Sequence, residues 1–377
     1  MSEERTTSES QIDEIPTTDL KSRPACCDNG RRIAAVLLAM TILVLTSLGF
    51  YFEWEPWNAT WYERTFWTSS IVEPNSDGEI VGDDPDQFAP SEPYFDMAVL
   101  SIPVDEIRSG GVLKDAIPAL TNPRLSAADT ASYLSEGDRV IGIVAGGEAR
   151  AYPLKIIEQH EIINDDVNGV PLVVTYCPLC DSSAVFDRRT RIGIREFGVS
   201  GLLYNSNVLM YDRGGQPQSL WSQVMAAGVS GPANTKMLDA LPLEVTTWKD
   251  WRSRHPDTKV LSTETGHHRN YDERPYARYY ASPDLAFSVN AMSDRLPPKA
   301  QVLGVWIGDV FRAYPNRAFG PTRARAEETL GGKKVVIEFN EVANSLRVST
   351  AGDGIHWMYS YWFAWYAMHP NTEVFEP

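Results

Sequence analysis

The chain has 377 residues, 43% of them apolar and 22% charged, which is an ordinary composition for a globular protein that can bury a sizeable core. Its net charge of −16 is concentrated in one stretch, because eleven acidic residues and one basic residue lie between Glu53 and Asp96. The rest of the chain is close to neutral, which excludes a basic surface for nucleic acid, so no nucleic-acid partner is expected.

The first 52 residues predict a membrane anchor. Residues 1–31 are polar and are expected to form a disordered cytoplasmic tail. Residues 33–52 form a charge-free run of 20 residues, about 30 Å as a helix, which matches the hydrocarbon core of a bilayer. Basic residues precede this run and acidic residues follow it. The positive-inside rule therefore predicts a single-pass cell-membrane protein whose C-terminal domain is periplasmic or extracellular; a cleaved signal peptide is the alternative.

Residues 53–94 follow as an acidic extracytoplasmic tether rich in Pro, Asp and Ser, and residues 95–377 form the predicted globular domain. Within this domain the stretch 140–153 ("VIGIVAGGEARAYP") recurs at 302–315 ("VLGVWIGDVFRAYP"). The pattern W-x-x-W-x-x-x-H-P-x-T-x-V likewise occurs at 248–260 and again at 362–374, with a weaker echo between 168–176 and 331–339. We therefore predict an α+β, strand-rich fold with two related halves from an internal duplication, about 135–262 and about 298–376.

The repeated Trp and His residues are expected to pack, because both halves contain them. The first half differs by a long insert that begins with Cys177 and Cys180, whereas position 177 aligns with Asn340 in the second half. A local function is therefore expected in the insert.

The sequence "TYCPLCD" allows three uses of the cysteine pair. The leading hypothesis is a soft-metal site for copper or zinc, with Cys177 and Cys180 joined by His160 or Met210, because thiolates, thioethers and imidazoles select such ions. Cys26 and Cys27 cannot contribute, since they lie in the predicted cytoplasmic tail. The first alternative is a thiol–disulfide oxidoreductase, although no long helix follows the motif as it does in thioredoxin-like proteins. A non-catalytic surface interaction module is the third possibility, with unknown protein partners.

Several long motifs resemble the family of domains of unknown function DUF3179. They are "HEIINDDVNGVPLVVTYCPLCDSSAVFDR" (160–188), "FGVSGLLYNSNVLMYDR" (197–213), "SLWSQ" (219–223), "HPDTKVLS" (255–262) and "WFAWYAMHPNTEVF" (362–375). The resemblance implies that the cysteine pair, His160 in its His-Glu context and the Phe-Gly-Val-Ser-Gly run are shared features. It implies no particular reaction, so whether the chain is an enzyme stays open. One departure is Asp181, where the family pattern leads us to expect glycine.

Overall fold

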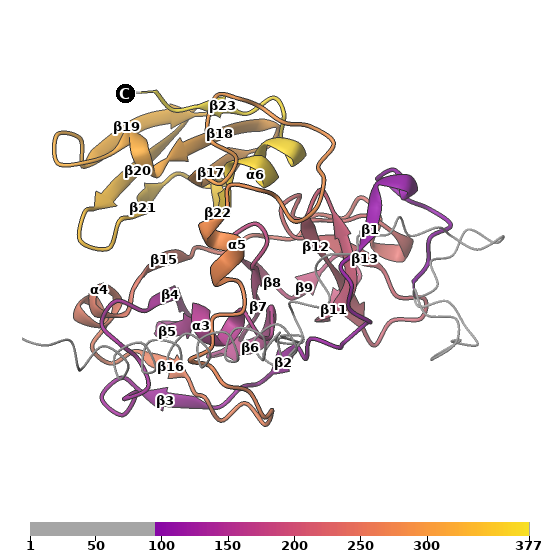
Figure 1. Ribbon diagram of the computed structural model, residues 1–377, viewed down its shortest axis with the longest axis horizontal. Helices are drawn as coiled ribbons and strands as arrows, with labels where there is room; N and C mark the ends of the chain where they lie inside the picture. Colours follow the sequence, from indigo (N-terminus) through magenta and orange to yellow (C-terminus); the bar gives the residue numbers. More distant parts are fainter. Residues whose placement is uncertain (1–94, 377) are drawn as a thin grey trace, which may run out of the picture. The chain divides into compact units, whose positions relative to one another are not determined.

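The computed structural model describes residues 95–376, so the predicted tail, membrane helix and tether lie outside the described residues. The described part is built mainly from β-strands, with a few short helices between them (Figure 1). This arrangement confirms the strand-rich α+β class. Among residues 95–376, no helix is both long enough and apolar enough to span a bilayer.

The first repeated block forms a five-stranded sheet in the order β15-β4-β5-β16-β3. Its pairs β15–β4 and β4–β5 are antiparallel, whereas β16 runs parallel to β5. A helix follows β15 directly and covers the sheet with its apolar side. The elements are β3 (Leu125–Ala127), β4 (Arg139–Ala145), β5 (Glu148–Pro153), β15 (Glu244–Thr247), α4 (Trp248–Arg254) and β16 (Lys259–Leu261).

The second repeated block has the same strand order and the same pairing directions, β22-β17-β18-β23. These four strands extend an eight-stranded sheet whose other members are β2, β6, β7 and β8. The elements are β2 (Leu120–Thr121), β6 (Ile162–Val167), β7 (Val170–Cys177), β8 (Ser182–Asp187), β17 (Gln301–Ile307), β18 (Val310–Pro315), β22 (His356–Tyr361), α6 (Trp362–Met368) and β23 (Glu373–Val374).

The repeated tryptophans pack in the same way in both blocks. Trp251 on α4 lies so close to Gly142 on β4 that a Cβ there would be 2.3 Å from the indole ring. Its indole N–H donates to Thr258 at 3.0 Å. In the second block, the indole N–H of Trp365 donates to Thr372 at 2.9 Å. The predicted packing role of these residues is confirmed.

Each half of the sequence also contains a three-stranded antiparallel meander. This meander is β6-β7-β8 in the first half and β19-β20-β21 in the second half. The meanders are exchanged between the halves, because β8 pairs with β22 and β21 packs on β15. The bounds of the second meander are β19 (Arg325–Leu330), β20 (Lys333–Asn340) and β21 (Ser345–Ala351). Each half thus completes the sheet region of the other.

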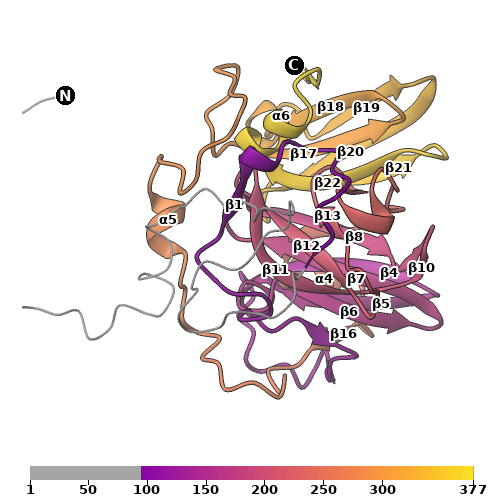
Figure 2. The ribbon, with the colours of Figure 1, turned by 90° about the vertical axis from the view of Figure 1, so that its right-hand side faces the viewer.

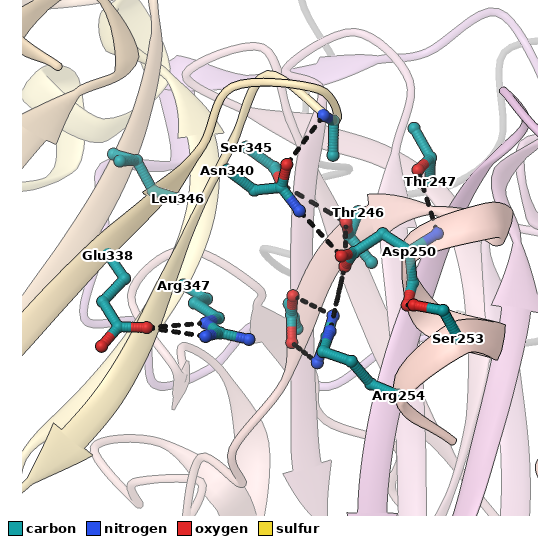
Figure 3. A network of polar contacts seen from close by, with 12 residues as sticks. Thr246, Thr247, Asp250, Ser253, Arg254, Glu338, Asn340, Ser345, Leu346 and Arg347 are labelled. Carbon is teal, nitrogen blue, oxygen red and sulfur yellow. Dashed lines mark hydrogen bonds and ion pairs between the residues drawn. The ribbon is translucent and has the colours of Figure 1, made fainter. Parts of the chain in front are cut away.

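Figure 3 shows this exchange at the turn between β20 and β21. Asn340 donates its side-chain amide to Asp250 on α4 at 2.7 Å, and its carbonyl oxygen accepts from the backbone of Ala343 at 3.1 Å. The hydroxyl of Ser345 approaches Thr246 on β15 at 3.4 Å. Asn340, the residue that aligns with Cys177, therefore forms a hydrogen bond between the two halves.

A further five-stranded sheet, β1-β11-β12-β13-β14, lies beside the β6–β8 meander (Figure 2). Its apolar side joins the core cluster that contains both cysteines, Phe197 and Trp221. The remaining elements are η1 (Val104–Glu106), β1 (Ile107–Ser109), α3 (Leu154–Ile157), β9 (Arg189–Thr190), β10 (Gly193–Ile194), β11 (Glu196–Tyr204), β12 (Asn207–Arg213), β13 (Leu220–Ser222), β14 (Ala227–Gly228), η2 (Gly231–Ala233), α5 (Ala277–Ala281) and η3 (Asn316–Ala318).

Candidate functional site

The cysteine motif forms the turn between β7 and β8. Cys177 ends β7 and pairs with Ser182 at the start of β8, so four residues close the turn. The backbone N–H of Cys180 donates to the carbonyl of Cys177 at 3.2 Å. Asp181 ends the turn with φ +43°, a left-handed conformation that glycine adopts most readily and aspartate tolerates. This backbone requirement explains the expected glycine, and aspartate adds a carboxylate there.

Both thiols are buried and unpaired, with Cys177 2% exposed and Cys180 fully buried. The Cys180 thiol donates to the carbonyl of Ser206 at 3.1 Å, and the Cys177 sulfur lies 3.9 Å from the same oxygen. The Cys180 side chain and the backbone N–H groups of Leu179, Cys180 and Val208 face the Cys177 sulfur. The Cys180 thiol is therefore directed at Ser206, whereas backbone N–H groups face the Cys177 sulfur.

This asymmetry separates the pKa values of the two thiols. Burial alone would raise the pKa of Cys177, but the hydrogen bonds to its sulfur outweigh burial and hold its pKa below the ordinary value. Burial, and then the neighbouring Cys177 sulfur, raise the pKa of Cys180 well above its ordinary value. The turn thus favours ionisation of Cys177 over ionisation of Cys180.

Glu161 places a carboxyl group next to this pair. Its backbone carbonyl accepts from Tyr176 at 2.8 Å, one residue before Cys177, and its φ of +59° is uncommon for a residue other than glycine. The side chain is 8% exposed, and within residues 95–376 its carboxyl group accepts no hydrogen bond. Burial, and then the charge of Cys177, raise the pKa of Glu161 well above its ordinary value. This environment therefore favours the protonated form of the carboxyl group.

A small void connects this carboxyl group to the turn. It measures about 20 Å³, roughly the room for one water molecule, and Glu161, Leu179 and Val208 line it. Leu179 and Val208 also carry two of the backbone N–H groups that face the Cys177 sulfur. The void therefore lies between Glu161 and residues that neighbour the Cys177 sulfur.

A buried polar cluster holds the neighbouring turn in place. Asn207 donates to Gln223 at 2.9 Å and to Ser182 at 3.2 Å, while Gln223 donates to Thr175 at 2.9 Å. The two-residue turn before Asn207 has positive φ at both positions, as tight hairpin turns require. This arrangement fixes the Ser206 carbonyl over the two sulfurs.

The predicted metal ligands lie as follows. His160 is fully buried, and its Nδ1 and Nε2 lie 2.7 Å from the Pro118 carbonyl and 2.7 Å from the Tyr271 hydroxyl, so both ring nitrogens are engaged. Met210 is buried on β12, on the side that carries Val208, in the core cluster that holds the cysteines. Within residues 95–376, no group of three or more His, Cys, Asp or Glu side chains is arranged to hold a metal ion.

Sequence reasoning missed Glu161 and the cluster around Asn207. A signal for Glu161 was present, because two carboxyl residues interrupt the apolar run "LKIIEQHEII" (154–163). Nothing in the pattern, however, indicates that the turn before Asn207 reaches the sulfurs.

The model of the family described as "Protein of unknown function (DUF3179)" matches residues 114–356. The chain belongs to the DUF3179 family. The match covers more than half of the chain and includes the cysteine turn, Glu161 and the exchanged meanders, so the expected family is confirmed. No curated protein and no solved structure matches this DUF3179 chain.

His160 gives a prediction for pH. Burial lowers the pKa of His160 to about 4, against the hydrogen bond to Pro118. In the unfolded chain the imidazole of His160 takes up a proton below about pH 6.5, whereas in the folded chain it stays neutral until about pH 4. The contribution of His160 to the free energy of unfolding is therefore highest above about pH 6.5 and falls as the pH drops towards 4. Between pH 6.5 and 5 the loss is about 2 kcal/mol. In urea titrations, His160→Asn should lower the free energy of unfolding at pH 7.5 but should flatten its decline between pH 6.5 and 5. An equal decline in the variant would show that His160 does not cause it.

Tyr279 on α5 gives a prediction for access to the thiols. Its hydroxyl donates to the carbonyl of Leu179 in the cysteine turn at 2.7 Å. Tyr279→Phe removes a hydrogen bond worth about 1 kcal/mol, so alkylation of the native thiols by iodoacetamide should accelerate about five-fold. The matched control is Tyr366→Phe, because the Tyr366 hydroxyl makes no hydrogen bond within the described residues. Equal rates in both variants would show that α5 does not limit access.

Proposed function

We propose that Cys177 and Cys180 form a redox-active dithiol that exchanges with a disulfide of a partner molecule on the outer side of a membrane. The observation that supports this best is the pair of free, buried thiols in one turn, with backbone N–H groups facing the Cys177 sulfur. Exchange requires only two adjacent sulfurs, one of them ionised, whereas a structural zinc site requires four ligands. The arrangement therefore favours the dithiol over the four-ligand metal site.

The reaction would proceed in two steps. The Cys177 thiolate attacks one sulfur of the partner disulfide, forming a mixed disulfide, and the other partner sulfur leaves as a thiolate that takes the proton of Glu161. Cys180 then gives its proton to the Glu161 carboxylate and attacks the Cys177 sulfur, which releases the second partner thiolate. The partner disulfide gains two electrons, and Cys177 and Cys180 become joined by a disulfide.

The compartment in this proposal comes from residues 33–52 and their flanking charges, which predict that the domain is exported. Disulfides form and persist outside the cytoplasm, so partners with disulfides are available there. A reporter enzyme fused to the C-terminus should be active only outside the cytoplasm. Cytoplasmic activity of the reporter would contradict this topology.

The dithiol is tested by equilibrating the full-length chain with defined ratios of reduced and oxidised glutathione. Mass spectrometry after alkylation should show interconversion between the dithiol and a Cys177–Cys180 disulfide, with a single midpoint potential. The reduced chain should also reduce insulin. A pair that stays reduced at every glutathione ratio would rule out the exchange.

Copper(I) binding is the second candidate, because backbone N–H groups around Cys177 favour a thiolate, and soft thiolate and thioether ligands select this ion. Cys177, Cys180 and Met210 would supply the ligands, since both ring nitrogens of His160 are engaged. Elemental analysis of anaerobically purified chain distinguishes the two candidates. One equivalent of copper that Cys177→Ser removes would favour metal binding.

We also infer that the two halves arose by internal duplication. Shared strand order, shared pairing directions and the repeated tryptophan contacts support this inference. Cys177 and Asn340 occupy corresponding positions, each opposite a serine across a four-residue turn. The thiol pair is then a feature of one half alone.

A further inference from the structure

A larger cavity is lined by Tyr176 and Asp181, which flank the cysteine turn. Its volume is about 270 Å³, the room for about nine water molecules, which is small for a ligand pocket and suits a sugar-sized molecule. The lining includes Arg139, Glu158, Arg274, Tyr280 and Tyr361. The thiols do not line it, and the dithiol proposal assigns it no role.

Glu158 is the least satisfied group in this cavity. It is 2% exposed, its Oε1 atom is buried without a hydrogen bond, and its only ionic partner within residues 95–376 is Arg274 at 3.5 Å. A buried carboxyl group without hydrogen bonds is costly, so a polar ligand at this position would be stabilised. Burial, opposed by Arg274 and assisted by Asp181, raises the pKa of Glu158 to about 7. Glu158 can therefore donate as well as accept a hydrogen bond near neutral pH.

The two arginines have unused donors. Arg139 uses only Nη1, which donates to the two oxygens of Asp181 at 3.0 and 3.1 Å. Arg274 donates no hydrogen bond within the described residues, and its side chain is 60% exposed at the mouth of the cavity. Guanidinium groups with free N–H groups recognise carboxylates, in many cases with two parallel hydrogen bonds.

The other charged groups of the cavity are already neutralised. Lys155 pairs with Asp138 at 3.2 Å and donates to the Tyr133 carbonyl at 2.6 Å. Asp181 accepts from Arg139 and from the Tyr176 hydroxyl at 2.9 Å. The groups that remain for a ligand are therefore guanidinium donors, one carboxyl group and tyrosine hydroxyls.

We propose that this cavity binds a small hydroxylated carboxylate, such as a sugar acid, whose carboxylate pairs with Arg139 and Arg274 and whose hydroxyl groups bond Glu158. The phenols of Tyr280 and Tyr361 provide further partners for hydroxyl groups. A neutral sugar lacks the group that the arginines recognise, and an amino sugar would place a cation beside them. The site is independent of the proposed dithiol.

The test uses the full-length chain in detergent and isothermal titration calorimetry with three probes of equal ring size. D-glucuronate should bind with a Kd of about 1 mM or tighter, whereas D-glucose and D-glucosamine should bind at least about ten-fold more weakly. Arg274→Gln and Glu158→Gln should each weaken glucuronate binding about ten-fold or more. Arg269→Gln removes the same charge from a nearby residue outside the cavity and should change the Kd less than about two-fold.

Several results would overturn the site: no saturable binding of glucuronate, equal binding of glucose or glucosamine, or full binding by Arg274→Gln. Unfolding curves of each variant separate a lost contact from a lost fold, and the exposed Arg274 is the safest position for this purpose. The double variant Cys177→Ser, Cys180→Ser should bind glucuronate with unchanged affinity. That control separates failure of this site from failure of the dithiol.

Discussion

Cys177→Ser is expected to abolish disulfide exchange, with a loss of at least about a hundred-fold in the rate of insulin reduction, because a serine hydroxyl is not ionised near neutral pH. Cys180→Ser should have a different result. The Cys177 thiolate can still attack, but no second sulfur releases the partner, so a mixed disulfide accumulates. Mass spectrometry of the chain after incubation with oxidised glutathione distinguishes the two variants.

The assignment of roles depends on this contrast. If Cys180→Ser cleared the mixed disulfide as fast as the wild-type chain, Cys180 would not be the resolving thiol. If Cys177→Ser formed the stable adduct instead, the two roles would be reversed.

Glu161→Gln is a finer probe, since it removes a proton acceptor while keeping the shape of the side chain. This variant should slow the release step more than the attack.

Gly142→Ala and Gly304→Ala are expected to have the largest effects on stability. A Cβ at Gly142 would lie 2.3 Å from the ring of Trp251, and a Cβ at Gly304 would lie 2.4 Å from the ring of Trp365. Both rings are buried in the core and have no free space to move, so each substitution should lower the free energy of unfolding by about 3 kcal/mol or more. Urea unfolding followed by tryptophan fluorescence measures the loss.

Gly320→Ala is the matched control in the second half. No atom lies within 4 Å of a Cβ built at Gly320, and its φ is not positive. This variant should change stability by no more than about 0.5 kcal/mol. A comparable loss in Gly320→Ala and Gly304→Ala would show that backbone freedom, and not the contact with the indole ring, requires glycine at position 304.

The repeated pattern could be read from the sequence because packing requires particular residues. The motif W-x-x-W-x-x-x-H-P-x-T-x-V places an indole over a strand and a threonine within reach of its N–H, and both copies retain the two residues. Once the two copies are aligned in sequence, the same strand order and pairing directions are expected in both. The exchange of the meanders does not follow, because either meander could pack on its own half with the same pattern of apolar residues.

The sequence singles out the cysteine turn, whereas the surroundings of this turn could not be predicted. His160 precedes the β6–β7 hairpin and looked available as a ligand, but its ring nitrogens contact Pro118 and Tyr271, residues 42 and 111 positions away. Glu161, the next residue, faces the thiols because of a left-handed backbone conformation. Sequence periodicity carries no information about such a local reversal of direction.

Because the meanders are exchanged, the cysteine turn depends on contacts with residues that are synthesised much later. The turn that holds Cys177 and Cys180 is complete early, but the backbone N–H of Tyr361 that donates to the Cys180 carbonyl at 2.7 Å is made roughly 180 residues later. Until those last residues emerge, the turn lacks its final cover, because contacts this distant in sequence form late. The two sulfurs of a nascent chain are therefore less covered until the C-terminal half closes over them.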